Sequence, residues 1–343
     1  MELYVRNWRC IEEARLDLRP ITIFIGKNAS GKSSLAYAAY FLAKISEWRD
    51  VNKVARRLYG APFKELVRQV SGEKFYPVEI VVGESRFVAT VDGVKMPQRS
   101  PWSRAYLLPS QRIALIKSLY FLTKILSRRV LTAHRVGSAS RQIMALILLE
   151  NYRDLLAGIP PTYFFIEDFF SLYGVGTSPH HYDLGREAGV LTENISLLFP
   201  LLADLKYRDP FVEHRLPIER APDGAVDLSL VKMYIEKARK DSLLVIEEPE
   251  AHKNPLLLIE MVKDLEKAVE KRITLVITTH SDVILNAIAK EVETGRLSTG
   301  DIALYYLERS QEAPWTRVKK IEVYEDGTFE ELPGALEVVS QIF

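Results

Sequence analysis

The chain has 343 residues, 48% of them hydrophobic and 27% charged, which is ordinary for a globular protein large enough to hold more than one domain. Its formal net charge of +1 leaves room only for local basic patches. No apolar run approaches the roughly 18 residues that a membrane helix needs, and the single cysteine, Cys10, excludes an intrachain disulfide and is typical of a reducing cytoplasm.

The first elements in chain order are strands. Residues 3–5 and the alternating segment 13–18 indicate two strands, so the N-terminus is a strand rather than a signal peptide. The apolar run 21–25 predicts a third strand, and a helix follows it from about Leu35 toward Trp48. Residues 79–91 have the pattern of a hairpin that leads into a second turn at Asp92-Gly93.

The middle of the chain, from Arg112 to about Tyr207, has a largely helical pattern, with helices expected at 113–125, 142–156 and 193–205. The second half alternates strands and helices, which predicts a parallel sheet with crossover helices. Its expected elements are helix 228–240, strand 243–246, helix 255–270, strand 273–278, helix 282–290, strand 303–307 and a hairpin from 320 that turns at Asp326-Gly327.

A phosphate-binding loop follows the strand at 21–25. Residues 26–33 read Gly-Lys-Asn-Ala-Ser-Gly-Lys-Ser and match G-x-x-x-x-G-K-[ST] between a strand and a helix. Gly26 and Gly31 allow the backbone N–H groups to face a phosphate, Lys32 is expected to reach the β- and γ-phosphates, and Ser33 to hold Mg²⁺. The residues expected to contact the nucleotide are Gly26, Lys27, Asn28, Ala29, Ser30, Gly31, Lys32, Ser33 and Ser34.

Two carboxylates follow the buried strand 243–246. Glu247 and Glu248 are therefore expected at the carboxyl edge of the sheet, where ligands bind in open α/β folds. We expect Glu247 to hold Mg²⁺ and Glu248 to orient or deprotonate the water that attacks the γ-phosphate. The next buried strand ends in His280, which is expected to donate a hydrogen bond to the γ-phosphate.

These motifs, in this order, resemble the ABC-type ATPases of the SMC/RecF/OLD group. The resemblance rests on the opening strand with Asn7-Trp8, the phosphate loop as Walker A, residues 247–252 as Walker B and D-loop, residues 279–282 as the H-loop, and the late hairpin. Residues 106–112, Tyr-Leu-Leu-Pro-Ser-Gln-Arg, resemble the Q-loop region. The resemblance implies that Gln111 contacts Mg²⁺ and the attacking water. Arg112 is the alternative candidate for this role.

Two features depart from the pattern of that group. The first Walker B acid is usually Asp, and here it is Glu247, whose longer side chain still reaches a metal. The signature motif, in which a Ser and a Gly at a helix start touch the partner's γ-phosphate, has two incomplete candidates. Leu228-Ser229 has the right chemistry but lies close to Glu247, and Pro222-Asp223-Gly224 has the better spacing. Asp227 or Ser229 is alternatively only a helix N-cap.

The predicted fold class is α/β, a P-loop NTPase with an ABC-ATPase-like core: a mixed β-sheet with flanking helices, an N-terminal antiparallel β subdomain and a helical insertion. The expected division is a discontinuous nucleotide-binding core, residues 1–111 and 210–343, around an insertion at 112–209. Basic side chains in the insertion are candidates for contacts with DNA or RNA, although a solvated helix face is the simpler interpretation. They are Lys117, Lys124, Arg128, Arg129, Arg135 and Arg141.

The sequence and the resemblance together predict a cytoplasmic, slow ATPase that uses ATP and Mg²⁺. Its catalytic residues would be Glu248, His280, Lys32 and Gln111, and its metal ligands Ser33, Glu247 and Gln111. The resemblance implies a nucleotide-dependent homodimer coupled to DNA or a protein partner, in DNA repair or defence. Too few residues follow His280 for the nuclease-like domain of some OLD relatives, so a nuclease or toxin would be a separate chain. The alternatives are a nucleotide-gated binding module with little hydrolysis and, less favoured, the ATPase subunit of a transporter.

Overall fold

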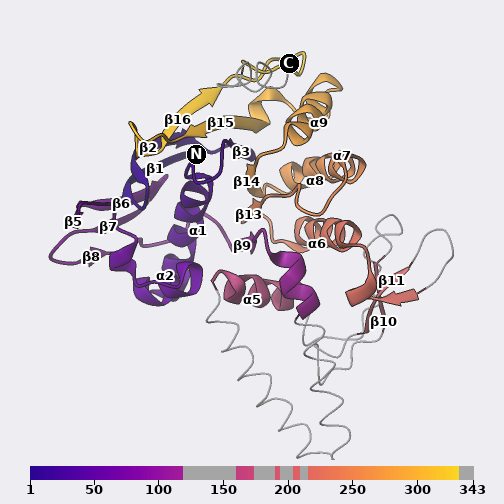
Figure 1. Ribbon diagram of the computed structural model, residues 1–343, viewed down its shortest axis with the longest axis horizontal. Helices are drawn as coiled ribbons and strands as arrows, with labels where there is room; N and C mark the ends of the chain where they lie inside the picture. Colours follow the sequence, from indigo (N-terminus) through magenta and orange to yellow (C-terminus); the bar gives the residue numbers. More distant parts are fainter. Residues whose placement is uncertain (119–159, 174–189, 194–203, 209–214, 332–343) are drawn as a thin grey trace, which may run out of the picture.

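The computed structural model describes residues 1–118, 160–173, 190–193, 204–208 and 215–331 (Figure 1). Its centre is a six-stranded sheet in the order β16-β15-β3-β14-β13-β9. The five strands from β15 to β9 are parallel, and only the edge strand β16 is antiparallel. The strands are β3 (Ile21–Ile25), β9 (Ala105–Leu108), β13 (Leu243–Glu247), β14 (Thr274–Thr279), β15 (Ile302–Glu308) and β16 (Arg317–Ile321).

The two faces of the central sheet carry different layers because side chains alternate along each strand. In β3, Ile21, Ile23 and Ile25 pack into one hydrophobic cluster, and Phe24 packs into the other. The first cluster includes the helices after β12, and the second includes helix α1 (Lys32–Trp48). The helices of the first cluster are α6 (Asp223–Lys237), α7 (Pro255–Lys263), α8 (Leu265–Glu270) and α9 (Asp282–Glu293).

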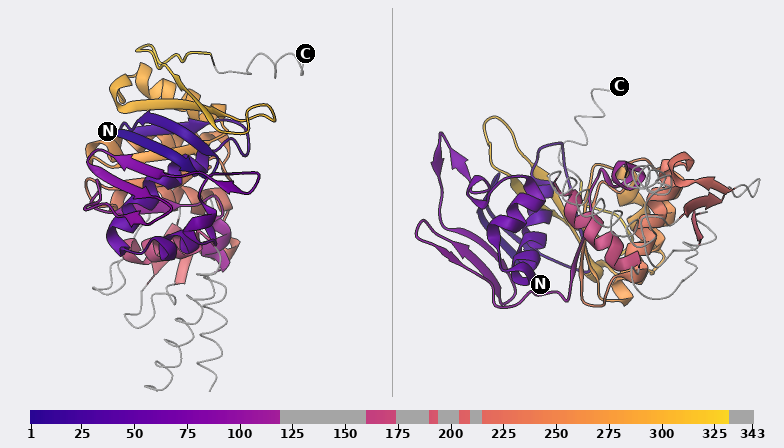
Figure 2. Two further views of the ribbon diagram at one scale, coloured as in Figure 1. Left: turned by 90° about the vertical axis from the view of Figure 1, so that its left-hand side faces the viewer. Right: turned by 90° about the horizontal axis from the view of Figure 1, so that it is seen from below.

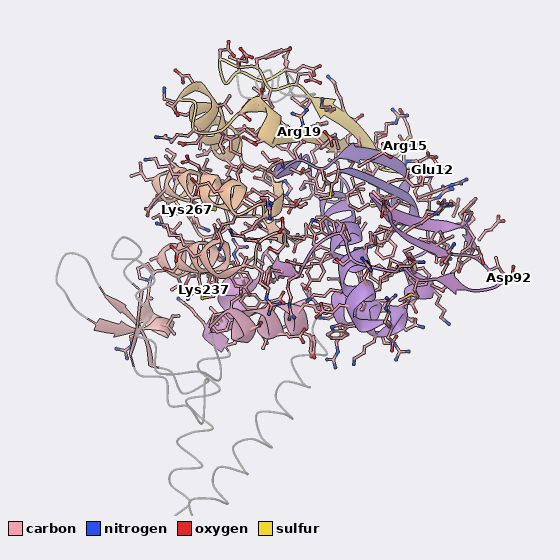
Figure 3. All side chains as sticks on the ribbon, turned by 180° about the vertical axis from the view of Figure 1, so that it is seen from behind. Glu12, Arg15, Arg19, Asp92, Lys237 and Lys267 are labelled. Atoms are coloured by element: carbon pink, nitrogen blue, oxygen red, sulfur yellow. The ribbon has the colours of Figure 1, made fainter. Side chains whose placement is uncertain are left out.

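A second, antiparallel sheet covers α1 from the other side, in the order β2-β1-β6-β7-β8. Helix α1 therefore lies between two sheets (Figure 2), which explains why nearly all of its side chains are buried. Asp92 marks the outer tip of this sheet in Figure 3. The strands are β1 (Glu2–Trp8), β2 (Ile11–Asp17), β6 (Val78–Val82), β7 (Ser85–Ala89) and β8 (Val94–Lys95); α2 (Val51–Tyr59) and the short pair β4 (Gln69–Val70) and β5 (Glu73–Lys74) adjoin it.

Helix α5 (Thr162–Tyr173) is tied to the core through a buried carboxylate. Asp168 accepts a hydrogen bond from the Leu107 backbone N–H at 3.1 Å, and its Oδ1 lies 3.5 Å from the Lys44 ammonium. Burial raises the pKa of Asp168 to about 6. A small antiparallel sheet of β10 (Val190–Glu193), β11 (Asp204–Arg208) and β12 (Arg215–Pro217) lies beyond α6 (Figure 1).

Most expected elements are present, including the mixed sheet and the antiparallel subdomain, but three expectations are wrong. The helix expected at 193–205 is wrong at both ends, where Glu193 is the last residue of β10 and Asp204 is the first residue of β11, and these two strands pair with each other; residues 194–203 lie outside the described ranges. The helix expected at 228–240 spans Asp223–Lys237 instead. The helix expected at 255–270 divides at Asp264, whose N–H bonds to Met261 and closes the first helix.

Some expectations fall on residues outside the described ranges: the helix at 142–156, most of the helix at 113–125, and every basic insertion side chain except Lys117. The late turn at Asp326-Gly327 is present, closed by a single bridge between Val323 and Phe329. The division into 1–111, 112–209 and 210–343 stays a prediction; β11 and β12 pair with each other across residue 210. None of the helices in the described ranges is long and apolar enough to cross a membrane.

Candidate nucleotide site

The phosphate loop connects β3 to α1 at the carboxyl edge of the central sheet. Gly26 and Gly31 have φ values of 151° and 106°, and Ala29 also has a positive φ of 61°. The Lys32 ammonium bonds to the carbonyls of Gly26 at 2.8 Å and Lys27 at 2.9 Å, so the side chain arches over the loop. Burial lowers the pKa of Lys32, while nearby glutamates oppose the shift. A positive charge is therefore held where the loop amides would receive phosphate.

The end of β15 and the segment that follows it, residues 307–316, brace this loop through contacts that the sequence pattern did not reveal. A Cβ atom on Gly26 would lie 2.0 Å from the carbonyl oxygen of Leu307, so only glycine fits there. Arg309 donates to the carbonyl of Ala29 at 3.0 Å, and the Thr316 hydroxyl donates to the carbonyl of Ser30 at 2.9 Å. Residues 307–316 thus fix the loop from outside, through contacts to its backbone.

The two acids at the end of β13 have different surroundings. Glu247 is the last residue of the strand and is buried, and its Oε2 accepts a 2.6 Å hydrogen bond from the Tyr37 hydroxyl on α1. Glu248 leaves the strand with a φ of 41°, a left-handed conformation that is rare for a residue with a side chain. This turn exposes the Glu248 side chain, which is 42% accessible.

His280 connects the phosphate loop to the acidic turn. Its Nδ1 lies 3.4 Å from the Lys32 ammonium, and its Nε2 lies 3.5 Å from Glu248 Oε1. An ammonium group only donates, so Nδ1 accepts, and a neutral ring then carries its proton on Nε2, facing Glu248. The backbone N–H of His280 bonds to Glu250 at 2.6 Å, and the Thr279 hydroxyl bonds to the same carboxylate oxygen at 2.9 Å. The end of β14 is thereby fixed to the acidic turn.

Behind the acidic turn lies a buried ionic cluster of Arg112, Asp227 and Lys253. Both cations contact the Asp227 carboxylate, and the side chains of all three residues are inaccessible to solvent. Arg112 also donates to the carbonyls of Glu247 at 2.6 Å and Glu248 at 3.3 Å. Burial lowers the pKa of Arg112 to about 10, and burial with the neighbouring guanidinium lowers the pKa of Lys253. The cluster joins the Q-loop-like segment, α6 and the D-loop-like segment.

The signature candidates lie on α6, and the structure corrects one interpretation of them. Pro222 is the N-cap of α6, so neither Asp227 nor Ser229 caps it. Asp227 belongs to the ionic cluster, and the Ser229 hydroxyl donates to the carbonyl of Ala225 inside the helix. Asp223 and Gly224 form the first turn of α6.

Gly224 packs closely against the D-loop-like segment, because an added Cβ would lie 2.7 Å from the His252 carbonyl oxygen. Asp223 is half-exposed and pairs with Lys117, which is the only one of the six basic side chains named as candidates for nucleic-acid contacts that lies within the described ranges. The N-terminal turn of α6 therefore presents an acidic side chain beside a helix start that has no room for a larger residue.

One pocket of about 570 Å³ brings residues from six parts of the chain together. Its walls include Asn28 to Ser34 of the phosphate loop, together with Glu248 and His280. Glu247 and Gln111 do not line the pocket: Glu247 is buried and Gln111 is exposed. Arg112, the alternative to Gln111, is buried and donates to the backbone of the acidic turn. Lining residues without a sequence signal are Arg9, Cys10, Glu65, Val67, Gln69, Arg309 and Trp315.

The donors near the phosphate loop suit a hard cation. The Ser33 hydroxyl and the Glu247 carboxylate offer oxygen ligands, which Mg²⁺ prefers together with phosphate oxygens. Among the described residues, no group of three or more His, Cys, Asp or Glu side chains could hold a metal ion by itself. The oxygen atoms of Ser33 and Glu247 therefore fit a magnesium ion that phosphate oxygens also coordinate.

Comparisons with known proteins identify the family and the fold of the chain. A family model described as "AAA domain, putative AbiEii toxin, Type IV TA system" matches residues 21–286. The chain belongs to this family. The match begins at β3 and extends past His280 into α9, so it includes the phosphate loop, the acidic turn and the histidine. No curated protein matches the sequence.

One solved structure of an SMC head domain shows the same fold. An SMC head bound to the C-terminal winged-helix domain of ScpA matches with a TM-score of 0.53 and 11% identity, covering 94% of this chain and 97% of that one. The SMC head of Thermotoga maritima (TM-score 0.45, 11% identity, 94% and 98% coverage) was also found. So was the Pyrococcus furiosus SMC head with an extended coiled coil bound to ScpA (0.47, 11%, 99% and 98%). The fold is that of an ABC/SMC-like P-loop ATPase, as the sequence predicted.

Proposed function

We propose that the chain binds ATP with Mg²⁺ in this pocket and hydrolyses it slowly. The observation that carries the proposal is the position of His280 between Lys32, 3.4 Å from its Nδ1, and Glu248, 3.5 Å from its Nε2, in the pocket beside the phosphate loop. Each comes from a different strand end, and each has a charge or proton suited to a γ-phosphate and its attacking water.

The residues divide the reaction between binding and water activation. Loop amides and Lys32 stabilise the phosphate oxygens, and Glu248 accepts a proton from a water that attacks the γ-phosphorus as the bond to the β–γ bridging oxygen breaks. His280 donates from Nε2 to a γ-phosphate oxygen once nucleotide separates it from Glu248. ADP and inorganic phosphate leave, and the proton passes from Glu248 to solvent.

Ser33 and Glu247 would hold the magnesium ion, which neutralises charge on the phosphate oxygens when bound. Gln111 was expected to share this role. In the structure its side chain points to solvent, while Arg112 contacts the backbone of both acids. We therefore assign to Arg112 the positioning of the acidic turn, and leave Gln111 as a residue for mutational comparison.

The proposal is tested with Glu248→Gln. We expect ATP binding to be retained and turnover to fall by at least about 100-fold, because the amide cannot accept the proton of water. Glu65→Gln is the matched control, since it makes the same change at another glutamate of the same pocket. Wild-type hydrolysis by Glu248→Gln protein would contradict the assignment.

The second candidate function is a nucleotide-gated binding module with little hydrolysis. It is favoured by the N-terminal turn of α6, the candidate signature motif, where Asp223 places a carboxylate at the helix start that would face a partner's phosphate. Wild-type protein that binds ATP tightly but releases phosphate no faster than Glu248→Gln would identify such a module. Measurable wild-type turnover supports the ATPase instead.

We further propose that ATP brings two copies together and that the cycle acts on DNA or on a separate effector chain in the cytoplasm, in DNA repair or defence. The family description names a toxin of a toxin–antitoxin system, which supports an effector partner. Sedimentation of Glu248→Gln with and without Mg·ATP tests the first step. An ATP-dependent dimer supports a shared site, and a monomer in both states means that another subunit completes the site.

A further inference from the structure

Glu247 is held by a side chain that no motif includes. The Tyr37 hydroxyl donates to Glu247 Oε2 at 2.6 Å, and both side chains are buried. A hydrogen bond to a carboxylate in such surroundings is strong and directional. The bond uses Oε2, so the Tyr37 hydroxyl does not occupy Oε1 of the same carboxylate.

We propose that Tyr37 is a positioning residue that holds the Glu247 carboxylate in place for the magnesium ion of Mg·ATP. The inference rests on the proposed function, and it gives Tyr37 no direct contact with nucleotide or metal. It accounts for the glutamate at a position where the ABC-type ATPases of this group usually have aspartate, since a longer side chain needs an additional contact to fix its carboxylate.

The helix places Tyr37 for this role. Ser33 and Tyr37 are four residues apart in α1 and therefore lie on the same helix face, one turn above the other. Helix α1 packs directly on β13, whose last residue is Glu247. One face of one helix thus supplies the expected metal ligand Ser33 and the hydroxyl that orients the other ligand.

The Tyr37 ring is itself immobilised by its neighbours. It packs against Tyr59 with ring centroids 5.6 Å apart, and the Arg9 guanidinium lies 4.4 Å from the centre of the Tyr59 ring. Arg9 also lines the pocket. A rigid ring holds its hydroxyl at one point, which is what a partner that orients a metal ligand must do.

The test is a Mg²⁺ titration of the binding of a fluorescent ATP analogue. We expect Tyr37→Phe to bind the analogue in EDTA with wild-type affinity, but to need about 10- to 100-fold more Mg²⁺ for half-saturation, the usual cost of losing such a partner. Tyr59→Phe is the matched control, since it removes a hydroxyl from the adjacent buried ring and should leave the Mg²⁺ requirement unchanged.

A double-mutant comparison sharpens the test. Glu247→Asp withdraws the carboxylate from the Tyr37 hydroxyl, so adding Tyr37→Phe to it should raise the Mg²⁺ requirement by less than twofold. Non-additive effects of this kind show that the two residues act through one contact. An additive loss would overturn the proposal.

Three further results would overturn it, and they separate its failure from that of the proposed function. A wild-type Mg²⁺ requirement in Tyr37→Phe protein defeats this inference alone. An equal loss of affinity with and without Mg²⁺ shows a merely structural role and also defeats it. Binding by wild-type protein that is indifferent to Mg²⁺ defeats the proposed function, and this inference with it.

Discussion

The two ends of the pocket are held in place by different kinds of interaction. At the phosphate-loop end, residues 26–34 are braced by residues 307–316 through backbone carbonyls, a hydroxyl and a close glycine contact. At the acidic-turn end, residues 247–253 rest on buried charges, with Asp227 between Arg112 and Lys253. The first arrangement tolerates little change in shape, whereas the second tolerates little change in charge. Substitutions that change side-chain shape should therefore act mainly at the phosphate-loop end, and substitutions that change charge mainly at the acidic-turn end.

The largest expected effect comes from removing the shared carboxylate of the ionic cluster. Asp227→Ala leaves Arg112 and Lys253 buried without a counter-charge, and we expect the free energy of unfolding to fall by about 3–5 kcal/mol. Denaturant unfolding measures it. Asp223→Ala on the same helix is the control, because its pair with Lys117 is partly exposed and should cost at most about 1 kcal/mol. Equal losses in the two variants would refute the role of the cluster.

A shape change should act most strongly at the phosphate-loop end. Gly26→Ala places a methyl group against the Leu307 carbonyl at a strained φ, and we expect ATP affinity to fall about 30- to 1,000-fold, or about 2–4 kcal/mol. Calorimetric titration with ATP checks this result. Gly83→Ala is the matched control: its φ is also positive, at 56°, but nothing lies within 4 Å. If Gly26→Ala binds ATP normally, the brace does not shape the loop.

Arg112→Lys keeps the positive charge in the cluster but removes the planar guanidinium group and its several N–H donors. We expect turnover to fall about 10-fold with ATP affinity unchanged, because the carbonyls of Glu247 and Glu248 lose charge-assisted hydrogen bonds of about 1.5 kcal/mol. Gln111→Ala changes the exposed neighbour, so phosphate-release assays on both variants compare the two candidates. A larger loss of turnover in Gln111→Ala would restore the role that the resemblance implied for Gln111.

The smallest expected effect is at a single hydroxyl of the brace. Thr316→Val removes the donor to the Ser30 carbonyl without changing side-chain shape, and should weaken ATP binding about fivefold, or about 1 kcal/mol. Thr328→Val is the control, since its hydroxyl bonds within the exposed turn at Asp326. Unchanged affinity in Thr316→Val would mean that Arg309 and the glycine contact suffice.

The sequence predicted those parts of the site that follow a local rule. Each of these buried parallel strands is a short apolar run. Glu248 and His280 directly follow their strands, Lys32 follows the phosphate loop after β3, and all three line one pocket at the carboxyl edge of the sheet. The parts that it missed depend on contacts between distant residues. Tyr37 and Glu247 are 210 positions apart, and Arg112 and Asp227 are 115 apart. No periodicity encodes such a pair.

The wrong secondary-structure expectations have the same origin. Residues 193–205 have apolar spacing that suits a helix, but pairing between β10 and β11 determines the conformation at both ends of the segment. Pro222 is the N-cap of α6, and a proline at a helix start is a sequence signal for that start, which the expected range of 228–240 did not include. At the helix break, Lys232 and Lys267 contact the Asp264 carboxylate from two different helices, contacts that the local sequence does not encode (Figure 3 labels Lys267).

The brace on the phosphate loop also has a consequence for protein synthesis. Residues 307–316 leave the ribosome long after β3 and α1, so a growing chain that has completed α9 still has a phosphate loop without its outer support. Under the proposed function, we expect tight nucleotide binding only after the strands β15 and β16 have been made and have joined the sheet. A chain interrupted before that point gains none of the stability that a bound ligand gives to a folded protein, and it is exposed to quality-control proteases.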